Sequence, residues 1–215
     1  MRSSPRYPYG LERREYQLLR TLRSPKHIQD FLDTLAINHE KKGETNWSPR
    51  RVLRERKAHC MEGAMLAATA FLLQGHPPLL LDLKSAPGDD DHVVALYRIN
   101  EYWGAVSKTN HATLRFRDPV YKTIRELALS YFHEYFLSET GLKTLRSYSL
   151  PFNLRRYGTS WITKDEDLWE LAEKLDDSPH TMLFPKSQVP LLRKADRVER
   201  AAGRIIEWSK HHPRT

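Results

Sequence analysis

The chain has 215 residues, of which 40% are hydrophobic and 29% are charged. This composition is typical of a globular protein and excludes a disordered or fibrous chain. There is no apolar run of about 18 residues and no apolar stretch near Met1, so we expect neither a membrane span nor a secretory signal. Cys60 is the single cysteine, which excludes an internal disulfide and indicates a cytoplasmic protein.

The formal net charge of +8 is unevenly distributed. Residues 1–58 hold 14 Lys and Arg against 7 Asp and Glu, residues 59–185 hold 13 against 17, and residues 186–215 hold 8 against 3. Basic ends can bind nucleic acid or an acidic surface. Because no nucleic-acid recognition motif is present, we favour the simpler interpretation that these charges lie on the solvated faces of helices.

The first 53 residues predict a pair of helices. One covers residues 11–22, and the second is capped by Ser24 and Pro25. A third helix should begin near Cys60, because small and apolar residues follow without Pro or Gly between Gly63 and Gly75. Gly75 is a natural point for that helix to end.

Three strands are predicted after this helix. They cover residues 79–83, 92–97 and 102–106, and a polar loop with Asp89, Asp90 and Asp91 separates the first two. His92 therefore opens a strand at the edge of a loop. A side chain in that position can be both rigidly held and accessible.

The rest of the chain is expected to be mostly helical. Pro119 followed by apolar residues at helical spacing indicates a helix with Asp118 as its N-cap. Residues 163–166 resemble a capping box, and residues 195–208 predict a last basic helix. Residues 141–158 are expected to cover a cleft or to add an edge strand. We expect one domain over residues 1–215, with a helical extension (1–53), a core (54–118) and a mostly helical C-terminal part (119–215).

Cys60 and His92 are the candidate nucleophile and base. A thiol attacks as the thiolate, and both a helix N-terminus and a nearby imidazole lower the pKa of a cysteine. Taken singly, a free cysteine is more often a small buried apolar residue and a histidine at a strand end is more often a surface group. A zinc site formed by His59, Cys60, His92 and the aspartates is disfavoured because paired ligand spacings are absent.

The order of these features resembles the transglutaminase-like superfamily of papain-like Cys-His-Asp folds. The resemblance covers residues 54–118: a helix that begins at Cys60, a Gly-x-Pro turn, a strand, His92 at the head of the next strand and Trp103 on the one after. It is closest to the small stand-alone bacterial members. It implies a catalytic triad, with an aspartate about 15 residues after the histidine. This chain has Ser107 at that position.

Three residues are candidates to orient the imidazole of His92. The orienting group accepts the Nδ1–H and so leaves Nε2 facing the sulfur. Asn110 is favoured, because an amide oxygen has this role in papain-like proteases. Ser107 is in register but is a weaker acceptor, and Asp118 is better explained as a helix cap.

The sequence thus predicts an α+β, papain-like or transglutaminase-like domain with an antiparallel sheet packed on the Cys60 helix. The predicted function is thiol-dependent acyl transfer, either amide hydrolysis or transamidation, with Cys60, His92 and Asn110 as catalytic residues. We expect a peptide or protein substrate, no cofactor and no bound metal. The alternative is an inactive module of the same fold that binds a peptide or protein partner. The sequence does not distinguish water from an amine as the final acceptor.

Overall fold

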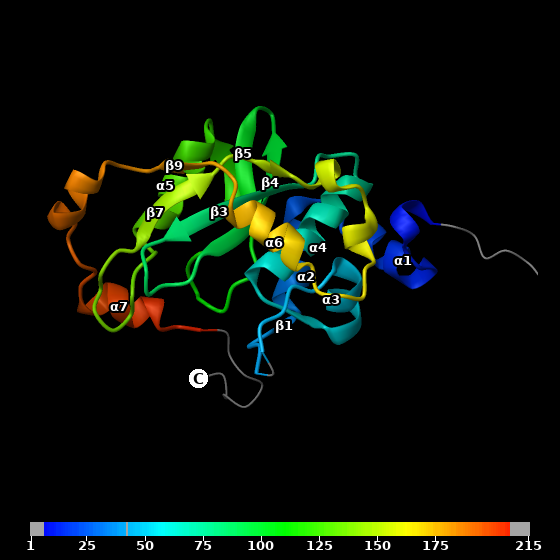
Figure 1. The fold of residues 1–215 in the computed structure, drawn as a ribbon, viewed down its shortest axis with the longest axis horizontal. Helices are drawn as coiled ribbons and strands as arrows, with labels where there is room; N and C mark the ends of the chain where they lie inside the picture. Colours follow the sequence, from blue (N-terminus) through cyan, green and yellow to red (C-terminus); the bar gives the residue numbers. More distant parts are fainter. Residues whose placement is uncertain (1–6, 42, 207–215) are drawn as a thin grey trace, which may run out of the picture.

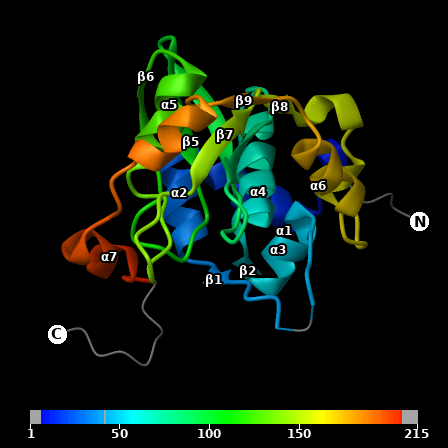
Figure 2. The ribbon, with the colours of Figure 1, turned by 60° about the vertical axis from the view of Figure 1, so that its left-hand side comes forward.

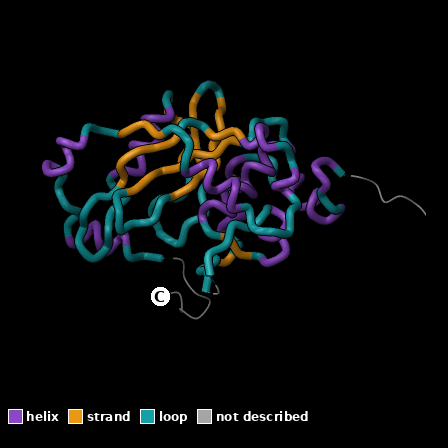
Figure 3. Tube along the Cα trace, viewed as in Figure 1, coloured by secondary structure: helices purple, strands orange, loops and turns teal. Residues whose placement is uncertain are grey.

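The computed structural model describes residues 7–41 and 43–206. It combines helices with a seven-stranded antiparallel sheet, which confirms the α+β class (Figures 1 and 3). The main path through the sheet runs β6-β5-β4-β3-β7-β9, and β8 pairs with β3 beside β7. No helix in these ranges is long and apolar enough to cross a membrane.

The chain enters this fold through helical segments that pack on one face of the sheet. After a short 3-10 turn, the helices are α1 (Arg13–Thr21), α2 (Pro25–Asp33) and α3 (Pro49–Glu55). Two short strands, β1 (Ala36–Ile37) and β2 (Lys57–Ala58), flank α3. Ser24 caps α2 by accepting a hydrogen bond from the backbone N–H of His27 at 3.3 Å. The predicted N-terminal pair of helices is confirmed.

The central helix and the next three strands also agree with the sequence pattern. Helix α4 spans Cys60–Leu73, and Gly75 follows it with a φ of +88°, a left-handed conformation that glycine adopts easily. The strands are β3 (Leu79–Ser85), β4 (His92–Ile99) and β5 (Tyr102–Val106). Their register pairs Leu81 with Val94 and Ala95 with Val106.

The C-terminal half adds helices and further strands. They are β6 (Arg117–Tyr121), α5 (Ile124–Phe132), β7 (Leu145–Ser149), β8 (Phe152–Asn153), α6 (Trp169–Asp176), β9 (His180–Met182) and α7 (Arg197–Gly203), with three short 3-10 helices between residues 154 and 191. Within residues 141–158, β7 lies inside the sheet between β3 and β9, where we expected at most an edge strand. Residues 119–206 thus combine helices with strands β7, β8 and β9.

Two predicted helix starts are wrong. Asp118 and Pro119 lie in β6, and α5 begins at Ile124 with Thr123 as its cap. Strand β6 is at the edge of the sheet, where the missing N–H of a proline is tolerated. Thr163 ends a 3-10 turn, and α6 starts only at Trp169. Of the predicted helix over residues 195–208, the structure describes α7, and the last two positions lie outside the described residues.

Alternating residues of the strands build two cores on opposite faces of the sheet. Figure 2 shows helices α4 and α5 on different sides of the strands. Val93, Ala95 and Val106 face the cluster that contains α4 and the N-terminal helices. Val94, Leu96 and Ala105 face the cluster that contains α5. Helix α4 is thus buried along nearly its whole length, and its N-terminus is fixed beside the first residues of β4.

Candidate functional site

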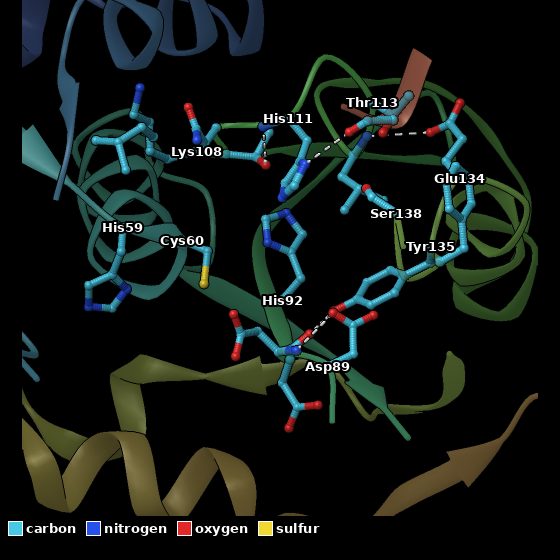
Figure 4. Close-up of a pocket in the computed structure, with 18 residues that line it drawn as sticks. His59, Cys60, Asp89, His92, Lys108, His111, Thr113, Glu134, Tyr135 and Ser138 are labelled. Carbon is cyan, nitrogen blue, oxygen red and sulfur yellow. Dashed lines mark hydrogen bonds between the residues drawn. The ribbon is translucent and has the colours of Figure 1, made fainter. Parts of the chain in front are cut away.

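Cys60 is the first residue of α4, where the backbone N–H groups of the first turn have no partner inside the helix. The helix starts here because Glu62 folds back and accepts the backbone N–H of His59 at 3.0 Å. The sulfur thereby lies at the positive end of a buried helix. The half-buried thiol points between the imidazoles of His59 and His92 (Figure 4).

The carboxylate of Glu62 fixes this helix end, although it is completely buried. Besides the N–H of His59, it accepts hydrogen bonds from Thr45 Oγ1 at 2.8 Å, from the backbone N–H of Trp47 at 3.0 Å and from Asn38 Nδ2 at 3.2 Å. These donors satisfy the acceptor oxygens of a carboxylate that has no contact with solvent. Glu62 thus holds residues 38–47 against the start of α4.

His59 is a second imidazole at the thiol, and the sequence analysis considered it solely as a zinc ligand. Its Nε2 lies 2.8 Å from the carbonyl oxygen of Thr45 and 3.4 Å from Glu62 Oε1. Burial lowers the pKa of His59, but the contact with Cys60, the charge of Glu62 and the bond to Thr45 together raise it to about 9. His59 is therefore a fixed cation near neutral pH. The position of His59 directly before Cys60 in the sequence is the feature that could have identified it as a second imidazole at the thiol.

His92 is held by Ser107. The Nε2 atom of His92 lies 2.7 Å from Ser107 Oγ, and the same hydroxyl lies 2.9 Å from the carbonyl oxygen of Leu114. Antiparallel pairing explains the contact, because Val106 at the end of β5 pairs with Ala95 and the residues after β5 continue toward the start of β4. The sequence analysis expected Nε2 to face the sulfur. Here Nε2 faces Ser107, so Nδ1 is left for the sulfur.

Ser107 is itself clamped by the side chain of Gln29 from α2. Gln29 Oε1 accepts the backbone N–H of Ser107 at 3.0 Å, and Gln29 Nε2 donates to the Ser107 carbonyl at 2.9 Å and to Asp33 Oδ1 at 2.9 Å. Both Gln29 and Ser107 are buried. Because the Gln29 amide hydrogen-bonds to both the N–H and the carbonyl of Ser107, it fixes the position from which the Ser107 hydroxyl contacts His92.

The next residue, Lys108, joins this segment to α4. Its completely buried side chain donates to the carbonyl of Leu35 at 2.7 Å. Its Cβ lies against Gly63, and a Cβ built on Gly63 would be 2.4 Å away from it. The chain after β5 can therefore approach α4 closely because residue 63 has no side chain.

The two imidazoles set the acidity of the Cys60 thiol. Burial raises the pKa of Cys60, but hydrogen bonding to His59 and to His92, with the charges of both rings, outweighs this and lowers it to about 5. At neutral pH the sulfur is then a thiolate beside an imidazolium. This is the ionisation state that a cysteine nucleophile requires.

Cys60 and His92 open into a cavity of about 210 Å³. The start of α4, the aspartate loop and the segments 108–114 and 134–138 line it, and Gly203 at the end of α7 closes one side. The backbone N–H of Ala112 donates to the carbonyl of Ile205 at 2.8 Å, which holds the chain after α7 against this wall. The cavity is large enough for a side chain of a substrate and carries charges of both signs.

The three sequence candidates for orienting His92 have different positions. Asn110 lines the cavity, but within the described residues its side chain makes no hydrogen bond to His92. Asp118 is exposed in β6 and does not line the cavity. The geometry therefore gives the orienting position to Ser107 and not to Asn110. The sequence argument ranked acceptor strength, whereas the decisive factor is which residue the sheet register brings to the imidazole.

A further group of acidic residues has the carboxylate oxygens that a metal ion could bind. Within residues 7–41 and 43–206, Asp82, Asp91 and Asp176 bring carboxylate oxygens within 4.8 Å of one another. This group contains neither Cys60 nor His92. The thiol site itself has no comparable set of ligands among these residues.

Comparison of the sequence with protein-family models gave no match, and comparison with curated proteins gave none either. The functional argument therefore depends on the geometry of the site.

Proposed function

We propose that this protein is a thiol-dependent acyl-transfer enzyme with Cys60 as nucleophile and His92 as the proton carrier. The observation that carries the proposal is the Cys60 thiol at the N-terminus of a buried helix, between two imidazoles that lower its pKa to about 5. The resemblance to transglutaminase-like, papain-like folds, which is drawn from the sequence around Cys60 and His92, agrees with it. Ser107 and Gln29 are positioning residues in this scheme, and Asn110 is no longer needed for it.

The two histidines have different roles in the proposal. His59, with a pKa of about 9, stays protonated near neutral pH and supplies a constant positive charge to the thiolate. His92 lies in the cavity and is anchored through one ring nitrogen, so its other nitrogen can exchange a proton with substrate. His59 thus stabilises the thiolate throughout the reaction, whereas His92 transfers protons to and from the substrate.

The reaction begins when the Cys60 thiolate attacks the carbonyl carbon of an amide or ester. A C–S bond forms and the π electrons move to oxygen, which the N–H groups of the first turn of α4 stabilise. The C–N or C–O bond then breaks, and the imidazolium of His92 gives its proton to the leaving group. A thioester remains on Cys60. Water or an amine then attacks the thioester, gives a proton to His92 and releases the thiolate.

Acylation of the full chain by p-nitrophenyl acetate tests the proposal. At pH 7 we expect a burst of p-nitrophenolate of about one equivalent per chain and an acetyl group on Cys60, detected by intact mass. Cys60→Ala should abolish both. His27→Ala, which changes an exposed histidine on α2, is the control and should leave the burst unchanged.

The competing function is the binding module that lacks catalysis. A folded chain whose Cys60 is not acetylated at pH 7, and which alkylates at the rate of a free thiol, would support the module and overturn the enzyme. The departure from the family's aspartate at position 107 is the feature that favours this alternative.

A further inference from the structure

A second group of side chains that could bind a ligand is a cluster of carboxylates behind the thiol site. Asp82 comes from the middle of β3, Asp91 from the loop before β4 and Asp176 from the last turn of α6 (Figure 1). Together with Asn46 and Met61 they line a separate cavity of about 130 Å³. Three negative charges gathered at one cavity need compensation.

The existing partners compensate this charge incompletely. His180 Nε2 lies 3.0 Å from Asp82 Oδ2, Lys84 Nζ contacts Asp176, and Asp91 Oδ1 accepts the backbone N–H of Ser85 at 2.7 Å. The other oxygen of Asp82, Oδ1, is buried and has no hydrogen-bond partner among the described residues. The Asp82 side chain is 4% exposed. An unpartnered oxygen on so deeply buried a carboxylate is costly, and in native proteins it usually has a ligand.

We propose that Asp82, Asp91 and Asp176 form a binding site for one hard divalent cation of the size of Ca²⁺. Two oxygens that bind the same Ca²⁺ at about 2.4 Å can be at most about 4.8 Å apart, and one oxygen of each of the three carboxylates lies within that distance of the other two. An all-oxygen ligand set favours Ca²⁺ or Mg²⁺ over softer metals. The buried amide of Asn46 lines the same cavity and belongs to the same class of ligand.

The proposal does not depend on catalysis, because it rests on the geometry of the three carboxylates and on the unpartnered Oδ1 atom of Asp82.

The position of the site suggests what the cation does. Asp91 directly precedes His92, and Met61, which lines the cavity, directly follows Cys60. A cation there would tie β3, the start of β4 and α6 together behind both residues of the thiol site. It would brace the loop that directly precedes His92, the first residue of β4.

Calorimetric titration of the chelator-treated full chain with CaCl₂ and, separately, MgCl₂ tests the site. We expect one Ca²⁺ per chain and weaker binding of Mg²⁺, which requires shorter and more regular distances. The melting temperature should rise by about 5 °C when Ca²⁺ is 100-fold above its Kd. Cys60→Ala should bind Ca²⁺ as the wild type does, so failure of the proposed catalysis would not affect this result.

Two variants locate the ligands. Asp82→Asn and Asp176→Asn should each weaken Ca²⁺ binding at least tenfold, whereas Asp177→Asn removes a neighbouring exposed charge and should bind normally. Without Ca²⁺, Asp82→Asn should melt at or above the temperature of the wild type, because it removes the unpartnered charge. Absence of binding at millimolar Ca²⁺ and Mg²⁺, or equal affinity in Asp82→Asn, would overturn the proposal. Tighter binding of Mg²⁺ than of Ca²⁺ would overturn the choice of ion.

Discussion

The hydroxyl of Ser107 lies 2.7 Å from Nε2 of His92 and determines which of the two ring nitrogens carries the proton. A serine hydroxyl has one proton, and Ser107 donates it to the carbonyl of Leu114 at 2.9 Å. Its oxygen must then accept from His92, so Nε2 is the protonated nitrogen. Nδ1 is left free to face Cys60, either as a base or, after protonation, as a donor to the thiolate. A serine anchored in this way can replace an acidic or amide acceptor.

The first prediction separates Ser107 from the residue that the sequence favoured. Ser107→Ala leaves the buried Nε2–H of His92 without a partner, which costs about 1–3 kcal/mol and releases the ring. Alkylation of Cys60 by iodoacetamide at pH 6 should then fall by roughly tenfold, because the ring no longer stabilises the thiolate. Asn110→Ala should leave the rate unchanged. The reverse pattern would restore Asn110 as the orienting residue.

The sequence identified part of this site because some of its features are local. A cysteine at the start of an apolar helix and a histidine at the head of a strand can be recognised within a few residues each. The contact of Ser107 with His92 depends on the register of β4 with β5 and on the clamp from Gln29, 78 residues earlier in the chain. The sequence alone shows neither the register nor the clamp, and it therefore favoured Asn110 over Ser107.

The second prediction concerns the pH dependence of thiol reactivity. Because the pKa of Cys60 is lowered to about 5, the thiolate should persist until the pH falls through about 5, well below the value of about 8.5 for a free thiol. The rate of alkylation should be half-maximal near pH 5. His59→Gln and His92→Gln should each move this midpoint upward, because each removes a positive partner. A wild-type midpoint above pH 8 would contradict the ion pair.

The same profile should distinguish the two histidines at high pH. The pKa of His59 is raised to about 9, so its charge is present below that pH and is lost as the pH rises through it. The intrinsic reactivity of the thiolate should therefore increase above about pH 9, when the stabilising charge disappears. His59→Gln should lack this second step. Persistence of the step in that variant would assign it to another group.

The third prediction addresses the buried carboxylate beneath the site. Glu62→Gln replaces two acceptor oxygens by one oxygen and an NH₂ group that must face donors from Thr45 or Trp47. We expect a loss of about 2–3 kcal/mol in the free energy of unfolding in urea. The pKa of His59 should fall as well, since the charge of Glu62 helps to raise it. Glu55→Gln, at an exposed position bonded to Arg54, is the control and should change neither quantity.

The fold was predictable where the pattern repeats within one element. The α4 helix and strands β3 to β5 have continuous apolar runs with clear ends, and the structure agrees with them. Strands β7 to β9 are short and are stabilised by pairing with distant segments, so their local sequence carries little signal. The Pro119 signal failed for a related reason, because an edge strand accepts a proline as readily as a first helical turn does.

The last prediction tests the close contact between α4 and the segment that follows β5. In an ordinary helix interior, alanine is more stable than glycine by about 1 kcal/mol. Gly63→Ala should have the opposite sign, because its Cβ would lie 2.4 Å from the Cβ of the buried Lys108. We expect a loss of about 1–3 kcal/mol in the free energy of unfolding.

The displacement should also reach the thiol site, since Lys108 directly follows Ser107. Alkylation of Cys60 at pH 6 should slow in Gly63→Ala even where the variant is fully folded by circular dichroism. Gly63→Ser, which adds one more atom, should lower both stability and reactivity further. If Gly63→Ala instead stabilises the protein and leaves the alkylation rate unchanged, the contact yields easily, and the position of Ser107 depends on Gln29 rather than on the packing of Lys108 against α4.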